Sequence, residues 1–375
     1  MLPPVGDAVQ FGPSHDPPVI TGHQCCWLDS GTSALALALT ILKHIDPTRR
    51  EVIIPAYTCP DLVAAARYAD LLPVVVDIGR GDPGYDLDSL AIAINEQTLA
   101  VVAVNFMGIR DRLNAIKSLL PSPCFLIEDC AQWLPEPFAT PTLYSDMAIA
   151  SFGRGKPASL LGGGLLLIGK HLGNEKLTLA ERVIREQVQE AAESAVKFRF
   201  KAWAYNRLRQ PFFYNLINVL PFLHLGETHY HPLAQIAAMA ALRLAHVYDA
   251  VTDYQLKSRD AQKAIEQMVA EIQSLTALPV KFSDRCGRLL RYPILCDDQA
   301  SRNNLLQALQ QKGLGASSLY KDALVTIPGV QKDVRLANSY TNASDFASRL
   351  LTLPVHSGVT VKHLQQMHRV LSQFE

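Results

Sequence analysis

The 375-residue sequence has no excess of charge of either sign, because 35 Lys and Arg residues balance 35 Asp and Glu residues. Without a basic excess, binding to nucleic acid through bulk electrostatics is disfavoured. The sequence also lacks any run of about 18 uncharged apolar residues, so we expect no membrane-spanning helix. The first 15 residues show neither a basic segment nor an apolar core, and we therefore expect no secretory signal.

Cysteines are few, and none of the seven has the spacing of a metal-binding motif. Cys124, Cys130 and Cys296 lie in apolar, strand-like stretches. The adjacent Cys25 and Cys26 suit neither a zinc site nor a disulfide framework. We therefore expect reduced thiols, a cytoplasmic location and no metal site.

Hydrophobic residues are abundant, at 49% of the chain, and between residues 30 and about 170 their pattern alternates. Helix-forming segments, the first at 33–39 and the second beginning at Pro60, are separated by short apolar runs. These runs predict strands at 52–55, 72–78, 99–106, 124–129, 147–152 and 165–169. Strands rich in Val, Ile and Leu that alternate with helices are typical of a mainly parallel sheet covered on both faces.

The rest of the chain divides into two further regions. Residues from about 171 to 225 are expected to be helical. Beyond them, a long polar helix at 253–275, strands at 291–295 and 351–355 and a closing helix predict a smaller α+β unit. The predicted fold class is therefore α/β, with a large domain at 1–245, which includes the helical insertion, and a small domain at 246–375.

The most informative segment is Ser151-Phe152-Gly153-Arg154-Gly155-Lys156, which is followed by three glycines at 162–164. It places Lys156 in a tight loop between two strands that read as buried. The preceding apolar run ends in the carboxylate of Asp129. A lysine amine that can form an imine and a carboxylate that can hold a protonated ring nitrogen are what a pyridoxal phosphate site requires.

Four separated motifs occur in the order that one family shows. They are Ser30-Gly31-Thr32-Ser33-Ala34-Leu35, Ile54-Pro55-Ala56-Tyr57-Thr58, Glu128-Asp129-Cys130-Ala131-Gln132, and Ser151-Phe152 with Lys156 and the glycine run. A fifth, at 349–358, resembles that family's closing strand and turn. In this order the motifs resemble the DegT/DnrJ/StrS aminotransferases, which are fold-type-I pyridoxal phosphate enzymes. The resemblance implies a seven-stranded-type sheet in the large domain and a homodimer with a shared active site.

The resemblance also assigns roles to individual residues. Asp129 would face the pyridine nitrogen and keep it protonated. Gln132 would donate to the phenolic oxygen of the cofactor, and Lys156 would hold the cofactor and move the substrate proton. The phosphate would be bound by four residues, namely Gly31, Thr32 and Ser33 at a helix start and the hydroxyl of Ser151.

Three positions depart from the family pattern. Cys59 stands where relatives place an aromatic residue that stacks on the cofactor. Asn105, in the stretch that ends at Gly108, replaces a histidine. The segment 229–231, His-Tyr-His, stands where relatives have an Asn-Tyr-Arg motif. In those relatives the motif helps to close the active site of the partner subunit. Loss of that arginine leaves open how an anionic substrate is held.

The insertion is also unusual, because basic residues alternate with aromatic ones at 197–207 and an apolar stretch follows at 211–225. One interpretation is a helical pair packed on the dimer or over the mouth of the active site. Alternatively, the segment contacts an anionic membrane surface or the substrate.

The expected function is transfer of an amino group, from glutamate, to a keto group on a nucleotide-linked sugar or a similar small metabolite. One alternative is a catalytically weakened relative with a binding or regulatory role, which the changes at Cys59, Asn105 and His229 motivate. Another is a pyridoxal phosphate sugar dehydratase. In that branch of the family a histidine replaces the lysine, whereas this chain keeps Lys156.

Overall fold

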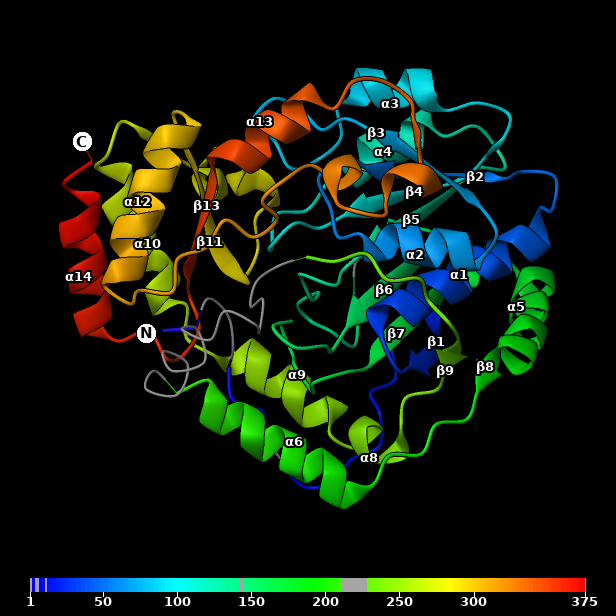
Figure 1. The fold of residues 1–375 in the computed structure, drawn as a ribbon. Helices are drawn as coiled ribbons and strands as arrows, with labels where there is room; N and C mark the ends of the chain where they lie inside the picture. The colour runs from blue at the N-terminus through cyan, green and yellow to red at the C-terminus, as the bar shows by residue number, and fades with distance from the viewer. Residues whose placement is uncertain (1, 4–6, 11, 142–143, 211–227, 375) are drawn as a thin grey trace.

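The computed structural model describes residues 2–3, 7–10, 12–141, 144–210 and 228–374. A large central sheet with helices on both faces occupies one side of the molecule, and a smaller sheet with its own helices occupies the other (Figure 1). This arrangement confirms the predicted α/β fold class. None of the helices in the described residues is long and apolar enough to cross a membrane.

The large sheet has eight strands in the order β1-β7-β6-β5-β4-β2-β3-β12. Their bounds are β1 His23–Leu28, β2 Glu51–Pro55, β3 Leu72–Val76, β4 Thr98–Val104, β5 Phe125–Asp129, β6 Met147–Ser151, β7 Gly164–Gly169 and β12 Arg335–Leu336. All neighbours from β6 to β12 are parallel, whereas β7 and β1 are added antiparallel. The sheet thus contains the seven strands that the resemblance implies, and the two-residue β12 adds an eighth at its edge.

Strand residues point alternately to two buried faces, as the near-continuous apolar runs require. On β6, Met147 and Ile149 join the core beneath α1, while Ala148 and Ala150 join the core on the opposite face. The first face is covered by α1 Gly31–Ile45, α2 Asp61–Tyr68 and α5 Asn174–Gln187. The second is covered by α3 Leu87–Ala93, α4 Leu113–Leu119 and α9 Val247–Leu256.

The smaller sheet is antiparallel, in the order β10-β11-β13. Its strands are β10 Leu275–Ala277, β11 Arg291–Cys296 and β13 Leu350–Pro354, and its main helices are α10 Asp260–Ala270, α12 Gln299–Gln311, α13 Thr341–Arg349 and α14 Val361–Leu371. We call residues 260–374 the C-terminal unit, although their short strand β12 pairs with the edge of the large sheet. Short pieces complete the chain: β8 Val188–Gln189, β9 Ile236–Ala237, α8 Ala241–Leu244, α11 Leu278–Lys281 and the 3₁₀ turns Lys170–Leu172, Ser283–Arg285, Leu324–Thr326 and Gln331–Asp333.

The single long helix predicted at 253–275 is wrong, because the chain breaks between α9 and α10. Lys257 is extended, and the Ser258 hydroxyl accepts the Asp260 N–H to start α10. The Arg288 guanidinium donates to the carbonyl oxygens of Gln255 and Lys257, which a continued helix would have used itself. Helix α9 packs its Val247 and Val251 onto the large sheet, although it follows the predicted domain boundary at 245/246. That boundary therefore stays a prediction.

The insertion forms α5, the short β8 and the helix α6, Ala195–Leu208. Its described part thus contains two helices joined by a strand and an irregular link, whereas the apolar stretch at 211–225 lies outside the described residues. α6 runs along the outer edge of the molecule (Figure 1). It contacts the body through buried Phe198, whose ring lies 5.0 Å below the Arg243 guanidinium of α8.

Candidate active site

The predicted site residues gather at the edge where the parallel strands end. Asp129 is the last residue of β5 and Ser151 the last of the parallel neighbour β6. The N-terminus of α1, at Gly31, reaches the same edge beside Ser151. In open α/β sheets, ligands bind outside the carboxyl ends of the strands. The structure therefore brings together residues that are 120 positions apart in the sequence.

The start of α1 forms the candidate anion site. The N-cap Ser30 accepts the Ser33 N–H across 3.0 Å. Gly31 and Thr32 are the first two helical residues, whose N–H groups have no acceptor within the helix. A Cβ on Gly31 would come within 2.8 Å of the Ser151 Cβ, so glycine permits the close approach of strand and helix.

Two of the predicted phosphate ligands have other partners. Ser33 is fully buried, and its hydroxyl accepts a hydrogen bond from the Ser30 hydroxyl across 2.9 Å. The Thr32 hydroxyl donates to Asp61 across 3.1 Å. Ser33 thus stabilises the helix start, and a direct role for either hydroxyl in phosphate binding stays a prediction.

The Asp129 carboxylate is 5% exposed and accepts the Ala131 N–H across 2.8 Å. Burial raises the pKa of Asp129, while the Ala131 N–H and the charge of Lys156 lower the pKa. Within the described residues it forms no ion pair with a basic side chain. A buried carboxylate of this kind is stabilised by a cation placed against it.

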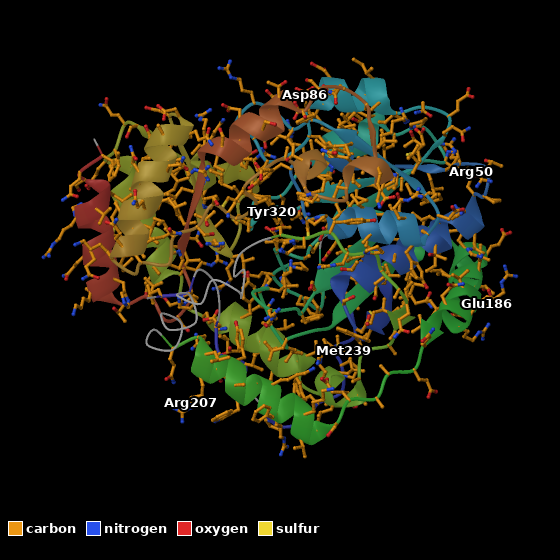
Figure 2. The ribbon with its side chains drawn as sticks, viewed as in Figure 1. Arg50, Asp86, Glu186, Arg207, Met239 and Tyr320 are labelled. Carbon is orange, nitrogen blue, oxygen red and sulfur yellow. The ribbon has the colours of Figure 1, made fainter. Side chains whose placement is uncertain are left out.

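Gln132 is held between the two units of the molecule. Its side-chain oxygen accepts the Met107 N–H across 3.1 Å, and its amide nitrogen donates to the Tyr320 hydroxyl across 3.2 Å. Tyr320 comes from the C-terminal unit and lies at the centre of the molecule (Figure 2). If Gln132 also donates to a cofactor oxygen, as predicted, the same amide nitrogen would serve both that oxygen and the Tyr320 hydroxyl.

The loop that carries Lys156 is pinned at both ends to buried Phe152. The Phe152 N–H donates to the Gly163 carbonyl, and the Phe152 carbonyl accepts the N–H groups of Leu160 and Gly162. Gly162 has φ +153° and lies against the Arg243 guanidinium, where a Cβ would collide with the Arg243 Nη1. The absence of a side chain at Gly162 thus lets the Arg243 guanidinium pack against this loop.

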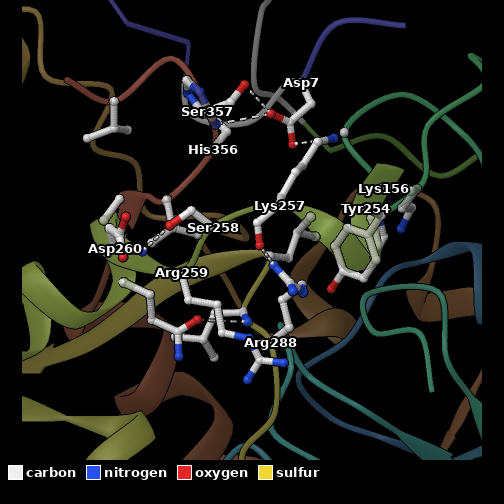
Figure 3. A pocket seen from close by; sticks show the side chains of 18 residues that line it. Asp7, Lys156, Tyr254, Lys257, Ser258, Arg259, Asp260, Arg288, His356 and Ser357 are labelled. Atoms are coloured by element: carbon white, nitrogen blue, oxygen red, sulfur yellow. Dashed lines mark hydrogen bonds and ion pairs between the residues drawn. The ribbon is translucent and has the colours of Figure 1, made fainter. Parts of the chain in front are cut away.

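Lys156 lies on the wall of a cavity of about 290 Å³ between the two units (Figure 3). Across the cavity, the Asp7 carboxylate accepts from the Ser357 N–H and hydroxyl and pairs with Lys257 across 3.2 Å. Arg288 and Tyr254 also line the cavity, with the guanidinium 5.2 Å from the ring. A small polar molecule in this cavity would lie beside the Lys156 amine.

Sequence reasoning missed two residues of this site. Asp61, the first residue of α2, binds Thr32 and adds negative charge that raises the pKa values of Cys59, Asp129 and Tyr320. A lone Asp after a proline reads as an ordinary helix start. Tyr320 lies in an irregular segment between α12 and α13, where no periodic pattern marks it.

The three departures from the family pattern are explained in part. Burial raises the pKa of the Cys59 thiol to about 12, and Lys156 and Asp129 both act on it, so Cys59 lies beside the site. Asn105 donates to the buried Glu128 across 2.9 Å and supports the end of β4. The Tyr230 hydroxyl donates to Asp333 across 2.8 Å within the same chain.

With this geometry in view, comparisons with known proteins identify the family. The profile of the DegT/DnrJ/EryC1/StrS aminotransferase family matches residues 20–207 and 231–372. The chain belongs to this family.

Solved structures share the fold at low sequence identity. PseC of Helicobacter pylori, an aminotransferase of pseudaminic acid biosynthesis, has a TM-score of 0.71 at 15% identity, over 95% of this chain and 87% of that chain. DesV of S. venezuelae has a TM-score of 0.69 at 20% identity, over 93% and 84%. The sugar aminotransferase Spr1654 of Streptococcus pneumoniae, in its pyridoxamine phosphate form, has a TM-score of 0.69 at 17% identity, over 94% and 88%. These likenesses confirm the fold-type-I architecture.

Proposed function

We propose that this chain is a pyridoxal-phosphate-dependent aminotransferase that acts on a keto group of a nucleotide-linked sugar or a similar small metabolite. The observation that carries the proposal is the shared strand edge, where Asp129, Ser151, the start of α1 and the Lys156 loop meet. Family membership supports the reaction class, and Spr1654 has been solved in both its pyridoxal and its pyridoxamine phosphate forms.

The residues present fit this cofactor. The buried Asp129 carboxylate suits a protonated ring nitrogen, because among the described residues it forms no ion pair with a basic side chain. The start of α1 offers N–H groups and a favourable dipole for a phosphate, beside the Ser151 hydroxyl. When bound, pyridoxal phosphate supplies a ring that withdraws electrons from the substrate carbon.

The chain's own groups would then orient substrate and move protons. Lys156 would hold the cofactor and, once displaced by the substrate amine, carry the proton at the substrate carbon. Asp129 would keep the ring nitrogen charged, and Gln132 would orient the ring oxygen. Of the predicted site residues only Lys156 lines the cavity between the units, so a substrate in that cavity would approach the cofactor from the side of Lys156.

Borohydride reduction tests the lysine assignment. Reconstituted protein should retain the cofactor on the peptide that contains Lys156, as mass spectrometry of a digest would show. The Lys156→Ala variant should lose this adduct, whereas Lys170→Ala, an exposed lysine at the end of the same hairpin, should keep it. An adduct that persists in Lys156→Ala would overturn the assignment.

A half-reaction with glutamate separates the enzyme from a weakened, cofactor-binding relative. The aminotransferase should release one 2-oxoglutarate per loaded site without any acceptor, and the cofactor should convert to its amine form. Cofactor that binds but never converts with glutamate or other amino donors would favour the binding or regulatory role.

The proposal includes a homodimer with a shared site and a cytoplasmic location. The segment at 229–231 lies on the surface, where its partly buried Tyr230 is tied to Asp333. Light scattering of the purified chain would show the dimer. If a dimer forms, mixing Lys156→Ala with a His229→Ala, His231→Ala double variant should restore part of any activity that both variants lack, provided that the sites are shared.

A further inference from the structure

Helix α6 presents an apolar stripe to solvent. Val196, Phe200 and Trp203 are 79%, 63% and 56% exposed, and their spacing places them on one face together with Arg207. The rings of Phe200 and Trp203 stack at 5.8 Å, so they form one continuous surface. We call Val196, Phe200, Trp203 and Arg207 the α6 stripe.

The opposite face of α6 is anchored to the body of the protein. Phe198 and Ala202 are fully buried, and Phe198 packs beneath Arg243. Asn206 exchanges two hydrogen bonds with the main chain of Val9, each 2.9 Å long. Because these contacts fix the rotation of the helix, the exposure of the stripe follows from the fold rather than from a loosely attached helix.

Basic side chains flank the stripe, and α6 contains no acidic residue. Lys197 and Lys201 lie on one flank and Arg199 on the other, while Arg207 lies on the stripe itself near its C-terminal end, at the outer edge of the molecule (Figure 2). The neighbouring Glu193 forms ion pairs with Arg243 across 2.6 Å and with Lys201 across 3.6 Å. An exposed Phe–Trp pair bordered by Lys and Arg is one feature of helices that lie in the headgroup region of a bilayer, although the other face of α6 is also apolar and packs on the protein.

We propose that α6 docks flat on an anionic phospholipid surface, with the α6 stripe in the headgroup region and Lys197 and Arg199 on its flanks against lipid phosphates. Charge complementarity selects this occupant. A two-fold contact between copies through α6 would bring basic flanks together, and like charges disfavour such an interface. The proposal goes beyond amino transfer, because it concerns where the enzyme works.

Vesicle co-sedimentation of the full chain tests the proposal. The protein should bind vesicles of phosphatidylcholine with phosphatidylglycerol and should bind pure phosphatidylcholine vesicles much more weakly. Raising the salt concentration should weaken binding. The double variant Lys197→Gln, Arg199→Gln should lose about fivefold in affinity per charge removed. Arg182→Gln, Arg185→Gln on α5 is the matched charge control and should bind like the parent.

A second pair of variants tests the apolar contact. Phe200→Ser, Trp203→Ser should abolish binding, whereas Ile92→Ser, Val361→Ser, which removes two residues that are 85% and 70% exposed elsewhere, should not. Since all four positions are exposed, these changes leave the core intact, and circular dichroism would verify folding. Equal loss in the control pair would overturn the proposal.

Trp203 also reports directly on the docked state. Brominated phosphatidylglycerol vesicles should quench its fluorescence, and Trp203→Phe should lose that quenching although buried Trp133 and partly buried Trp27 remain. Without vesicles, iodide should quench Trp203. Protection from iodide in the free protein would mean that a second copy, or another segment of the chain, covers the stripe, and either result would overturn the proposal. Binding to an acidic protein but not to the anionic vesicles would overturn it as well.

Discussion

Gln132 donates its side-chain amide to the hydroxyl of Tyr320 across 3.2 Å, and the bond joins the large sheet to the C-terminal unit directly beside Asp129. The Tyr320 carbonyl in turn accepts the Tyr57 hydroxyl, so the tyrosine is held from both ends. The position of the C-terminal unit and the orientation of the Gln132 amide therefore depend on each other at the site.

Replacing Tyr320 with Phe removes the acceptor of the Gln132 amide. We expect the free energy of unfolding to fall by about 1 kcal/mol, the usual contribution of such a hydrogen bond. We also expect a changed absorption spectrum of the bound cofactor, because the amide would be free to turn. Urea denaturation and absorption spectra would measure both, with the exposed Tyr248→Phe as control. A variant with parental stability and spectrum would contradict the coupling.

A second link between the units depends on Gly108. The Gly287 N–H donates to the Gly108 carbonyl, and Gly108 adopts φ +110° against the Arg288 carbonyl. Gly108→Ala should therefore destabilise the protein by more than the 1–2 kcal/mol typical of a left-handed backbone alone. Gly22→Ala, at φ +79° with nothing within 4 Å of the added Cβ, isolates that backbone cost. Equal unfolding free energies for the two variants would show that the contact with Arg288 is unimportant.

Much of the large sheet could be predicted because its strands are local apolar runs. Val52 to Pro55 and Leu99 to Val104 are legible without any tertiary information. The break after α9 could not be predicted, since the Arg288 side chain that binds its last carbonyls comes from more than 30 residues away. Propensity alone favours continuing the polar helix through Lys257.

In the candidate site, too, residues that follow from local sequence patterns differ from residues whose positions depend on distant contacts. Asp129 and Ser151 each end a strand that the pattern reveals, and Lys156 lies in the loop that follows Ser151. Their roles stay predictions, but these three residues were predictable as neighbours of the strand edge. Tyr320 and Asp61 were not, because their places depend on how the C-terminal unit and α2 pack against the sheet. The hydroxyl of Ser33 shows the limit of motif reading, since it faces Ser30 in the buried helix start.

Asp61 places a carboxylate beside the candidate phosphate site, where it accepts the Thr32 hydroxyl. Asp61→Asn keeps an acceptor for Thr32 and removes the charge. We expect cofactor affinity to rise severalfold, because Asp61 is exposed and repulsion between unit charges about 4 Å apart in water is about 1 kcal/mol. Fluorescence titration of the apoprotein at two salt concentrations would measure the change, and the gain should shrink at high salt. Unchanged affinity would place Asp61 too far from the phosphate to act on it.

The Cys59 thiol should react slowly at neutral pH. Burial, reinforced by Asp61 and opposed by Lys156, raises the pKa of Cys59 from 9.0 to about 12. Because only the thiolate is nucleophilic, the reactive fraction at pH 8 is about a thousandfold lower than for an unshifted thiol. Mass spectrometry after iodoacetamide treatment should show labelling of Cys59 that rises tenfold per pH unit up to pH 10 and that bound cofactor suppresses. Fast labelling at pH 7 would contradict the burial of this thiol.

His356 should make the docking of the N-terminal segment sensitive to acid. Its Nδ1 accepts the Gly358 N–H across 3.1 Å and its Nε2 donates to the Pro3 carbonyl across 3.0 Å, so the ring is neutral. Burial lowers the pKa of His356 below 6.5, an effect that the Pro3 carbonyl and Asp7 partly oppose.

The unfolded chain therefore binds a proton before the folded one does. The stabilising contribution of neutral His356 is complete above pH 6.5 and is lost as the pH falls from 6.5 towards the folded-state pKa. Urea denaturation from pH 7.5 to 5 should show unfolding free energy falling by at most about 1.4 kcal/mol per pH unit for this group. His356→Gln should flatten part of that slope, while His368→Gln, at an exposed histidine on α14, should leave it unchanged. Identical slopes for parent and His356→Gln would show that His356 does not contribute and would leave the acid sensitivity to His23, His246 and His363, whose pKa values burial also lowers.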